Sequence, residues 1–390
     1  MTTSKHFVLL VGGSGTRLWP FSRSFAPKQF IGFKLETTLI QETASRIQTL
    51  SPFSPLSDDK SSKLLAITHF ENVHEVERQL AFLNHTNQII LGEPERKNTL
   101  PAMAWAVAQI SLENPNSLSD TLIAVFPSDH HIEPISHLKS DLDKAYELAL
   151  EGFVVTLGIK PHVPETGYGY IQAGTPVKAG YHVKKFTEKP SLTKAEAYLK
   201  EGNYFWNSGI FIFTAQTFQT ELKKHEPEIF YAIQKIIASQ NNPEVLKSEY
   251  SKLKNISIDY GLIEKMGEQP GRVAMVPASF VWNDLGGWSS VFDILPKDEN
   301  QNAQQGDIVT LDTHNSLLIS KKGTLAAIGL QDMVVAQTDD AVLVCPKDRS
   351  QDVKKNCRTL KRKKSSCRGP SSNSKTTLGN IYRFRRRIVL

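Results

Sequence analysis

The sequence is poor in cysteine and has no long apolar run near its start. Its 390 residues include three cysteines, which lie late in the chain and form no CxxC pair: Cys345, Cys357 and Cys367. This number and placement exclude a disulfide framework and give no sign of a zinc site. The longest early apolar run, residues 7–11, is too short for a signal peptide or a membrane span. We therefore expect a cytoplasmic location and no membrane span.

Acidic residues are absent from the last part of the chain. Residues 353–390 contain thirteen Lys and Arg and no Asp or Glu, whereas the whole chain has 46 basic and 40 acidic residues and a net charge of +6. The first 352 residues therefore hold 33 basic and 40 acidic residues, a net charge of −7. This distribution excludes a uniformly basic nucleic-acid-binding domain. Nucleic acid is not an expected partner, except through the basic tail.

Short apolar runs alternate with amphipathic stretches over the first 290 residues. The apolar runs predict buried strands at residues 7–11, 64–68, 88–91, 121–126 and 153–159. The stretches between them predict helices at residues 39–50, 72–83, 99–112 and 138–150. This alternation predicts a Rossmann-like α/β domain whose central sheet is mostly parallel and covered on both faces. Ligands of such sheets bind beyond the carboxyl ends of the strands.

The pattern changes after Trp288. Five short apolar segments, beginning at residues 307, 316, 324, 333 and 341, predict a small β domain that is either a meander or a short β-solenoid. Antiparallel strands that complete the first sheet are the alternative. The chain is thus divided into an α/β domain at residues 1–290, a small β domain at 291–352 and a basic tail at 353–390. The composition of the tail predicts disorder.

A glycine-rich loop follows the first predicted strand, and it consists of Gly12, Gly13, Ser14, Gly15 and Thr16. Glycines at a strand end let backbone N–H groups converge on an anion. The loop lacks the Lys-Ser/Thr of a P-loop and the third glycine of a dinucleotide fingerprint. Arg17 and Lys28 would supply two cations for a triphosphate. A tight turn with solvated charges is the alternative.

Residues 12–30, GGSGTRLWPFSRSFAPKQF, closely resemble the signature of the sugar nucleotidylyltransferases. Their Leu-Trp-Pro and Pro-Lys-Gln-Phe variants resemble those of bacterial mannose-1-phosphate guanylyltransferases. Six further motifs extend the resemblance to nearly all of the expected folded part: EPERKNT (93–99), PSDH (127–130), PETGYGYI (164–171), FTEKP (186–190), WNSGIF (206–211) and WNDLGGW (282–288). Seven motifs in one order are a specific signal.

The resemblance implies transfer of GMP from GTP to mannose 1-phosphate. An oxygen of the sugar phosphate would attack the α-phosphorus and expel pyrophosphate without a covalent enzyme intermediate. Catalysis is then alignment of the substrates and neutralisation of charge on the transferring group. We expect Lys28 and Arg17 at the β- and γ-phosphates and Lys189 at the phosphate of the sugar. Together with Asp129, these are the expected catalytic residues.

Asp129 follows the predicted strand at residues 121–126 through Pro127-Ser128. From its position alone, this carboxylate is equally suited to hold Mg²⁺ or to cap the next helix. The resemblance assigns Asp129 and Asp284 as ligands of Mg²⁺, the expected cofactor. His130 and His131 lie beside Asp129, and we interpret them as supporting groups because magnesium avoids imidazole.

The resemblance also distributes the two substrates over the remaining motifs. The phosphates of the nucleotide are expected on the glycine-rich loop, and its base and ribose on residues 93–99. Glu93 or Glu95 would accept the N–H donors of guanine, and Asn98 is a further nucleotide contact. Without the resemblance, Asn98-Thr99 would simply begin a helix. Sugar phosphate contacts are expected at four residues: Gly167, Glu188, Lys189 and Asn207.

Many long bacterial members of the family carry a second, cupin-type domain with phosphomannose isomerase activity and clustered histidines. The last histidine here is His314, so we expect no isomerase activity, and a chain that is truncated or altered by a frame change. Two other functions stay open: another sugar-1-phosphate nucleotidylyltransferase, such as a glucose-1-phosphate thymidylyltransferase, or a non-catalytic regulator whose basic tail binds nucleic acid. The sequence does not fix the oligomeric state, and a homodimer stays open.

Overall fold

The centre of the molecule is a mixed sheet. The computed structural model describes residues 3–13, 16–23, 26–33, 37–50, 62–83, 87–112, 115–267, 271–353 and 388–389. Within these ranges the sheet has ten strands in the order β18-β3-β2-β1-β4-β9-β6-β10-β8-β7. Four neighbouring strands run parallel, as the sequence predicts: β3 (Gln88–Glu93), β2 (Leu64–His69), β1 (Ser4–Val11) and β4 (Thr121–Pro127). Their apolar side chains are buried on both faces of the sheet.

The direction of the sheet changes at β9 (Tyr204–Thr214). This strand lies antiparallel between β4 and β6 (Val154–Ile159). Next to β6 lies β10 (Val273–Pro277), which is parallel to it, followed by the hairpin strands β8 (Gly180–Glu188) and β7 (Gly169–Val177). Because β7 also pairs with β9, these five strands close on themselves. The closure brings motifs that are far apart in the sequence to one region.

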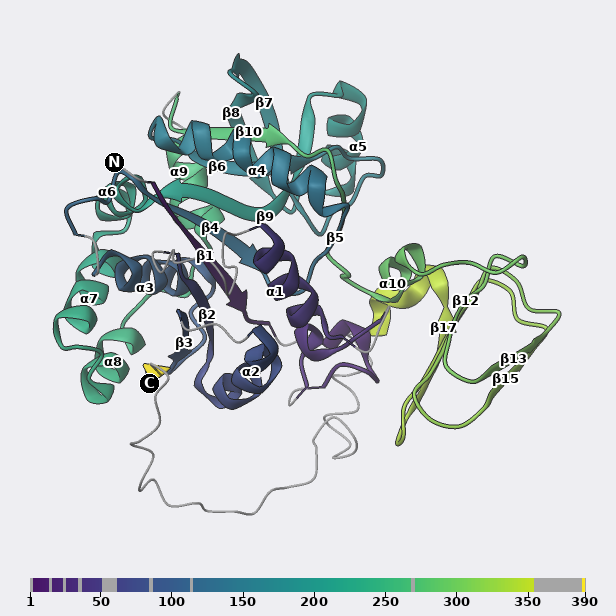
Figure 1. The fold of residues 1–390 in the computed structure, drawn as a ribbon. Helices are drawn as coiled ribbons and strands as arrows, with labels where there is room; N and C mark the ends of the chain where they lie inside the picture. The colour runs from purple at the N-terminus through teal and green to yellow at the C-terminus, as the bar shows by residue number, and fades with distance from the viewer. Residues whose placement is uncertain are drawn as a thin grey trace.

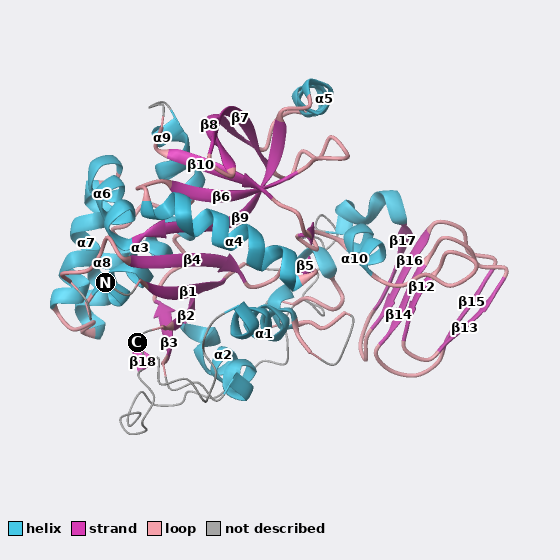
Figure 2. Ribbon diagram, turned by 45° about the horizontal axis from the view of Figure 1, so that its top comes forward, coloured by secondary structure: helices cyan, strands magenta, loops and turns pink. Residues whose placement is uncertain are grey.

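Helices cover both faces of the sheet (Figures 1 and 2). One face carries α1 (Leu39–Leu50), α2 (Val73–Leu80) and α4 (Ile135–Leu150). The other carries α3 (Thr99–Ser111), α6 (Ala215–His225), α7 (Pro227–Ala238) and α8 (Pro243–Ser251). A further helix, α5 (Leu192–Glu201), precedes β9 and packs through Tyr198. The sheet therefore has a separate apolar core on each side.

The small β domain is a short β-solenoid. One sheet contains the parallel strands β12 (Ala303–Gln305), β14 (Leu317–Ser320) and β16 (Met333–Gln337). A second contains β13 (Ile308–Leu311) and β15 (Leu325–Ile328), also parallel. The last strand, β17 (Val342–Pro346), is antiparallel to β16 and ends the domain. The sequence predicts five of these strands but not β12. The alternative prediction, antiparallel strands that complete the sheet of the first domain, is wrong because these strands form sheets of their own.

The solenoid packs against the segment that follows the glycine-rich loop. Trp288 is fully buried at the start of α10 (Trp288–Ile294), and its ring meets those of Phe21 and Phe33 at centroid distances of 5.4 and 6.2 Å. Arg23 forms an ion pair with Asp340 of the solenoid at 2.5 Å. The boundary predicted at residue 290 falls inside α10, because this helix belongs to the core shared by the two domains.

Beyond Val353, the basic tail is described at only two residues. Ile388–Val389 form β18, which pairs in parallel with the edge strand β3, although the sequence predicts no structure there. The rest of the predicted tail, residues 354–387 and 390, lies outside the described residues. Within the ranges that the structure describes, no helix is both long enough and apolar enough to cross a membrane.

Candidate active site

The glycine-rich loop begins at the carboxyl end of β1, as the sequence predicts. Gly12 and Gly13 are exposed, and Gly13 has a φ of +106°, a conformation that favours glycine. Ser14 and Gly15 lie outside the described residues. The chain resumes in the short 3-10 helix Thr16–Leu18, on which Arg17 is exposed. The loop thus leaves open backbone at the strand end where a phosphate would bind.

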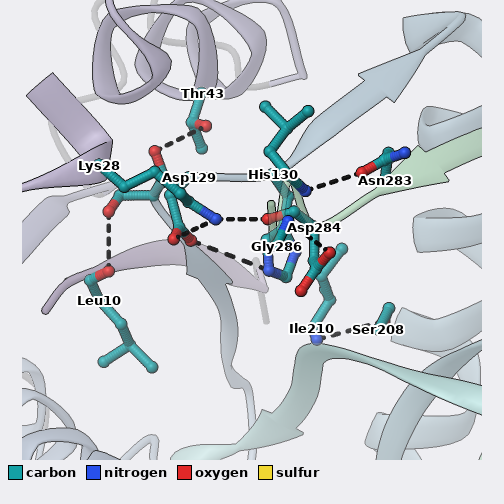
Figure 3. Close-up of polar contacts among 12 residues, drawn as sticks. Leu10, Lys28, Thr43, Asp129, His130, Ser208, Ile210, Asn283, Asp284 and Gly286 are labelled. Atoms are coloured by element: carbon teal, nitrogen blue, oxygen red, sulfur yellow. Dashed lines mark hydrogen bonds and ion pairs between the residues drawn. The ribbon is translucent and has the colours of Figure 1, made fainter. Parts of the chain in front are cut away.

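Lys28 contacts both residues that are predicted to bind metal (Figure 3). It begins the short helix Lys28–Phe30, and its Nζ lies 2.7 Å from Oδ2 of Asp129. The same Nζ donates a hydrogen bond to the backbone carbonyl of Asp284. The exposed fraction of the Lys28 side chain is only 13%. Three residues separated by up to 256 positions in the sequence therefore meet at one point.

The turn after β4 holds Asp129 beside the end of β1. The backbone N–H and the hydroxyl of Ser128 both donate to the carbonyl of Leu10, at 3.3 and 2.9 Å. Burial opposes ionisation of Asp129, but the charge and the hydrogen bond of Lys28, together with further contacts, outweigh it and hold the pKa of the carboxyl below its usual value. Asp129 is therefore ionised at neutral pH, which suits a metal ion. The capping alternative has no support, because Pro134 precedes the next helix.

His130 lies beside Asp129 as a neutral ring. Its Nδ1 accepts a hydrogen bond from Nε1 of Trp282 at 3.1 Å, which leaves the ring proton on Nε2. That Nε2 lies 3.8 Å from Asp129, too far for a hydrogen bond. Burial lowers the pKa of His130 to about 4, so the ring carries no charge at neutral pH. The interpretation of His130 as a supporting group agrees with this geometry.

A strand pairing brings Asp284 to the same place. β11 (Val281–Asn283) pairs antiparallel with β5 (His131–Glu133), which follows Asp129 directly. Oδ1 of Asp284 accepts hydrogen bonds from the hydroxyl of Tyr168 at 2.6 Å and from the N–H of Gly286 at 2.9 Å. Burial and the charge of Asp284 raise the pKa of Tyr168 far above its usual value, so its hydroxyl remains a donor.

The residues predicted to bind the sugar phosphate lie around the closed group of strands. Lys189 follows β8, is 58% exposed and forms an ion pair with Glu188. Asn207 lies on β9 and donates to Oδ1 of Asp259 at 2.9 Å. The N–H of Gly167 donates to its neighbour Glu165, at 2.8 Å. Asp259, which sequence analysis did not single out, links these residues: it accepts from Asn207, and the charges of Glu188 and Lys189 act on its carboxyl.

Tyr168 joins this group to the carboxylates. Its hydroxyl binds Asp284, and its backbone carbonyl accepts from the N–H of Lys189 at 3.2 Å. Tyr168 lies in the bend directly before β7 and therefore contacts both the carboxylate Asp284 and the predicted sugar-phosphate residue Lys189. The sequence contains this tyrosine within a motif, but no local pattern indicates its two partners.

The residues predicted to bind the base lie apart from the Lys28 cluster. Glu93 ends β3, and β2 and β1 separate it from β4. Its Oε1 accepts from the hydroxyl of Tyr250 at 2.6 Å, and burial raises the pKa of its carboxyl to about 7. Glu95 is exposed and pairs with Lys97 at 3.0 Å. Asn98 caps α3, because its side chain accepts a hydrogen bond from the N–H of Thr99. The prediction that Asn98-Thr99 begins a helix is therefore confirmed.

Comparison with protein families identifies the larger domain. A model described as Nucleotidyl transferase matches residues 6–301. The chain belongs to the nucleotidyl transferase family. A second model, described as MannoseP isomerase/GMP-like beta-helix domain, matches residues 306–360, which include the solenoid. The nucleotidyl transferase domain thus contains all the predicted site residues.

Relatives of this nucleotidyl transferase match over most of the chain. Mannose-1-phosphate guanylyltransferase 2 of Escherichia coli O157:H7 is 37% identical over 366 residues, which are 91% of this chain and 73% of the relative. Alginate biosynthesis protein AlgA of Pseudomonas aeruginosa is 37% identical over 354 residues, 89% of this chain and 70% of the relative. The crystal structure of a Thermus thermophilus protein named mannose-1-phosphate geranyltransferase superposes with a TM-score of 0.80 at 32% identity, covering 92% of this chain and 100% of that one.

Nucleotidyl transferases generally use a divalent metal ion, and two carboxylates of this chain suit one. Asp129 is ionised and partly exposed. Asp284 accepts two hydrogen bonds from described residues, and both go to Oδ1 and not to Oδ2. These hard oxygen donors fit Mg²⁺ better than a soft ion. In the part of the chain that the structure describes, no group of three or more His, Cys, Asp or Glu could hold a metal. Substrate phosphates and water would therefore complete the coordination shell.

Proposed function

We propose that this nucleotidyl transferase transfers GMP from GTP to mannose 1-phosphate and releases GDP-mannose and pyrophosphate. The observation that carries the proposal is the cluster in which Lys28 contacts both Asp129 and Asp284. An amine and two carboxylates at the carboxyl edge of a parallel sheet suit phosphoryl chemistry. The names of the relatives, mannose-1-phosphate guanylyltransferases, support these two substrates.

The reaction is a displacement at the α-phosphorus of GTP. An oxygen of the ionised sugar phosphate forms the new P–O bond, and the bond to pyrophosphate breaks. The nucleophile is already an anion, so no protein base is needed. Lys28 and Arg17 would neutralise the departing pyrophosphate. Asp129 and Asp284 would hold Mg²⁺, which supplies further charge neutralisation when bound.

The second substrate would lie on the closed group of strands. Lys189 is exposed at the end of β8 and would bind the phosphate of the sugar. Glu188 and Asn207 would bind sugar hydroxyls. Tyr168 contacts both Lys189 and Asp284, so it would hold the two substrate positions in register. Alignment of this kind contributes much of the rate acceleration in reactions without covalent catalysis.

The choice of guanine depends on the segment after β3. Glu93 or Glu95 would accept the N–H donors of guanine, and the loop at residues 12–16 would bind the phosphates. Asn98 would act through its position at the start of α3, where it has a φ of +69°. The cytoplasmic location, the homodimer and nucleic acid binding by the basic tail stay predictions.

Pyrophosphate release tests the proposal directly. The protein is assayed with Mg²⁺ and mannose 1-phosphate, and GTP, dTTP and UTP are compared. We expect GTP to give the highest rate. Asp129→Asn should lower kcat by at least about 100-fold, because it removes a metal-binding charge worth several kcal/mol.

The matched control is Asp143→Asn on α4, where the carboxylate is half exposed and pairs with Lys139. This variant should keep the wild-type rate. Equal rates for wild type and Asp129→Asn would refute the assignment of Asp129. A higher rate with dTTP than with GTP would refute the assignment of guanine.

A further inference from the structure

The amide of Asn207 is held in one orientation. Its Oδ1 accepts hydrogen bonds from the hydroxyl of Thr156 at 2.8 Å and from the N–H of Gly209 at 3.2 Å. Its Nδ2 donates to Oδ1 of Asp259 at 2.9 Å. A backbone N–H can only donate and an ionised carboxylate can only accept, so the two contacts identify which end of the amide is oxygen. A flipped amide would break both of them.

This arrangement limits what Asn207 can offer to a ligand. An amide oxygen has two lone pairs, and both are used by Thr156 and Gly209. An amide nitrogen has two N–H groups, and Asp259 takes one of them. The other N–H has no partner among the described residues. Asn207 can therefore present a hydrogen-bond donor to a sugar oxygen, but it has no acceptor left to present.

The state of Asp259 is compatible with this role. The carboxylate is partly buried, and burial together with the charge of Glu188 raises its pKa to about 6, while Lys189 acts in the opposite direction. Asp259 is thus mostly ionised at neutral pH and accepts the N–H of Asn207. An ionised acceptor makes a stronger hydrogen bond than a neutral one.

The segment that carries Asp259 is fixed to the opposite side of the site. The N–H of Ile256 donates to the carbonyl of Lys97 at 3.1 Å, and the N–H of Ile258 donates to the hydroxyl of Thr99 at 3.0 Å. Asp259 then begins a π-helical turn, Asp259–Ile263, and a Cβ added at Gly261 would lie 2.3 Å from Leu100. A larger residue at position 261 would therefore require the buried side chain of Leu100 to move. The contacts with Lys97 and Thr99 connect the segment of Asp259 to the motif at residues 93–99.

We propose that Asp259 is a positioning residue of the sugar subsite: it holds Asn207 so that the amide gives an N–H donor to a sugar oxygen and offers no acceptor. This inference rests on the proposed function, because that function places the sugar at Asn207. It adds a residue from a segment that connects the nucleotide motif to the sugar motif. It also states which hydrogen-bonding partner the subsite selects, namely a sugar oxygen that accepts.

The test uses three variants of the full chain: Asp259→Asn, Asn207→Asp and the double variant that carries both. Asn207→Asp places two carboxylates at a 2.9 Å contact, so its Tm should fall. In the double variant an amide again faces a carboxylate, so the Tm should return close to that of the wild type. This stability readout reports on the contact whatever the substrate of the enzyme is.

Substrate kinetics supply the second readout. Asp259→Asn should raise KM for mannose 1-phosphate three- to tenfold and change KM for GTP less than twofold. The double variant should keep a raised KM for the sugar phosphate despite its recovered Tm, because a carboxylate at position 207 cannot donate. Asp143→Asn serves again as the matched control.

Each outcome decides a separate question. Recovery of both Tm and KM in the double variant would show that the contact is only structural and would overturn the inference. An unchanged KM in Asp259→Asn would overturn it as well. A wild-type protein that uses another hexose 1-phosphate would overturn the proposed function alone, and the same KM comparison with that substrate would then decide the inference.

Discussion

Two carboxylates at one edge of the parallel sheet have opposite electrostatic environments. Asp129 follows β4 and Glu93 ends β3, with β1 and β2 between these strands. Burial opposes ionisation of both carboxyl groups. The pKa of Asp129 is nevertheless below its usual value, whereas the pKa of Glu93 rises to about 7. Burial alone therefore does not set the charge of a carboxylate at this edge.

The nearest cation explains the difference. Lys28 lies 2.7 Å from Asp129, and its charge and hydrogen bond lead the contacts that together outweigh burial. Glu93 has the neutral hydroxyl of Tyr250 as its closest partner, and the charge of Arg96 acts on it only weakly. The turn after β4 thus keeps an anion suited to a metal ion. The end of β3 has a carboxyl group that changes its charge near neutral pH.

Removing the cation Lys28 should abolish the difference in pKa shift between Asp129 and Glu93, and it should lower the reaction rate more than any other substitution discussed below. Lys28→Met keeps the length of the side chain but leaves burial to dominate at Asp129, so the pKa of that carboxyl should rise. We expect kcat to fall by about 10²- to 10³-fold, the loss typical of one charge-stabilising donor. The residual activity should increase with pH through a higher pKa than in the wild type. Both quantities come from a pH–rate profile of pyrophosphate release.

Lys139→Met on α4 is the control, since this lysine is exposed and lies outside the site. It should leave the profile unchanged. A Lys28→Met variant whose rate differs from the wild type by less than fivefold would contradict the proposed role of Lys28.

Making Glu93 permanently neutral should give an effect that depends on pH. In the folded protein the pKa of Glu93 lies above the value of about 4.3 for an unfolded chain. The folded state therefore binds more protons than the unfolded state between these values, and the wild type loses stability as pH rises from about 4 to 7. The loss at this site is at most about 4 kcal/mol. Glu93→Gln should remove it.

The measurement is the free energy of unfolding at pH 5 and pH 8 for both proteins. Other groups titrate equally in the two, so the change in their difference reports on Glu93. Relative to the wild type, Glu93→Gln should gain stability at pH 8. A difference that is the same at both pH values would refute the raised pKa.

Much of the fold follows from local patterns in the sequence. The parallel strands β1 to β4 are continuous apolar runs, and the strands of the solenoid recur at short, regular intervals, so both are predicted. The position of β9 in the sheet cannot be predicted in this way, because its apolar run indicates only that the strand is buried. Which strands flank it depends on contacts across the whole chain. The short strand β12 was missed because three residues carry too little periodicity.

The site divides in the same way. Lys28, Asp129 and Asp284 lie within motifs, so the resemblance to a family locates them, and the structure shows them in contact. Asp259 and Tyr250 lie in no motif that we recognised. Tyr250 meets Glu93 across 157 positions of sequence, and this contact exists only because α8 packs against the end of β3. Charge states such as that of Glu93 depend on burial and partners, which a sequence does not specify.

Tyr250→Phe should give the smallest change in unfolding free energy, and it tests most directly whether Glu93 changes its charge near neutral pH. It removes the hydroxyl that donates to Glu93 but keeps the ring that packs on Trp105. At pH 5, where Glu93 is neutral, the variant should lose about 1 kcal/mol of unfolding free energy, the value of an ordinary hydrogen bond. At pH 8 the carboxylate is ionised and the bond is charge-assisted, so the loss should rise to about 2 kcal/mol. Tyr231→Phe, at an exposed position on α7, should lose nothing at either pH. An equal loss at pH 5 and pH 8 would mean that Glu93 does not change its charge in this range, and Glu93 and Asp129 would then differ in their neighbours but not in how they titrate.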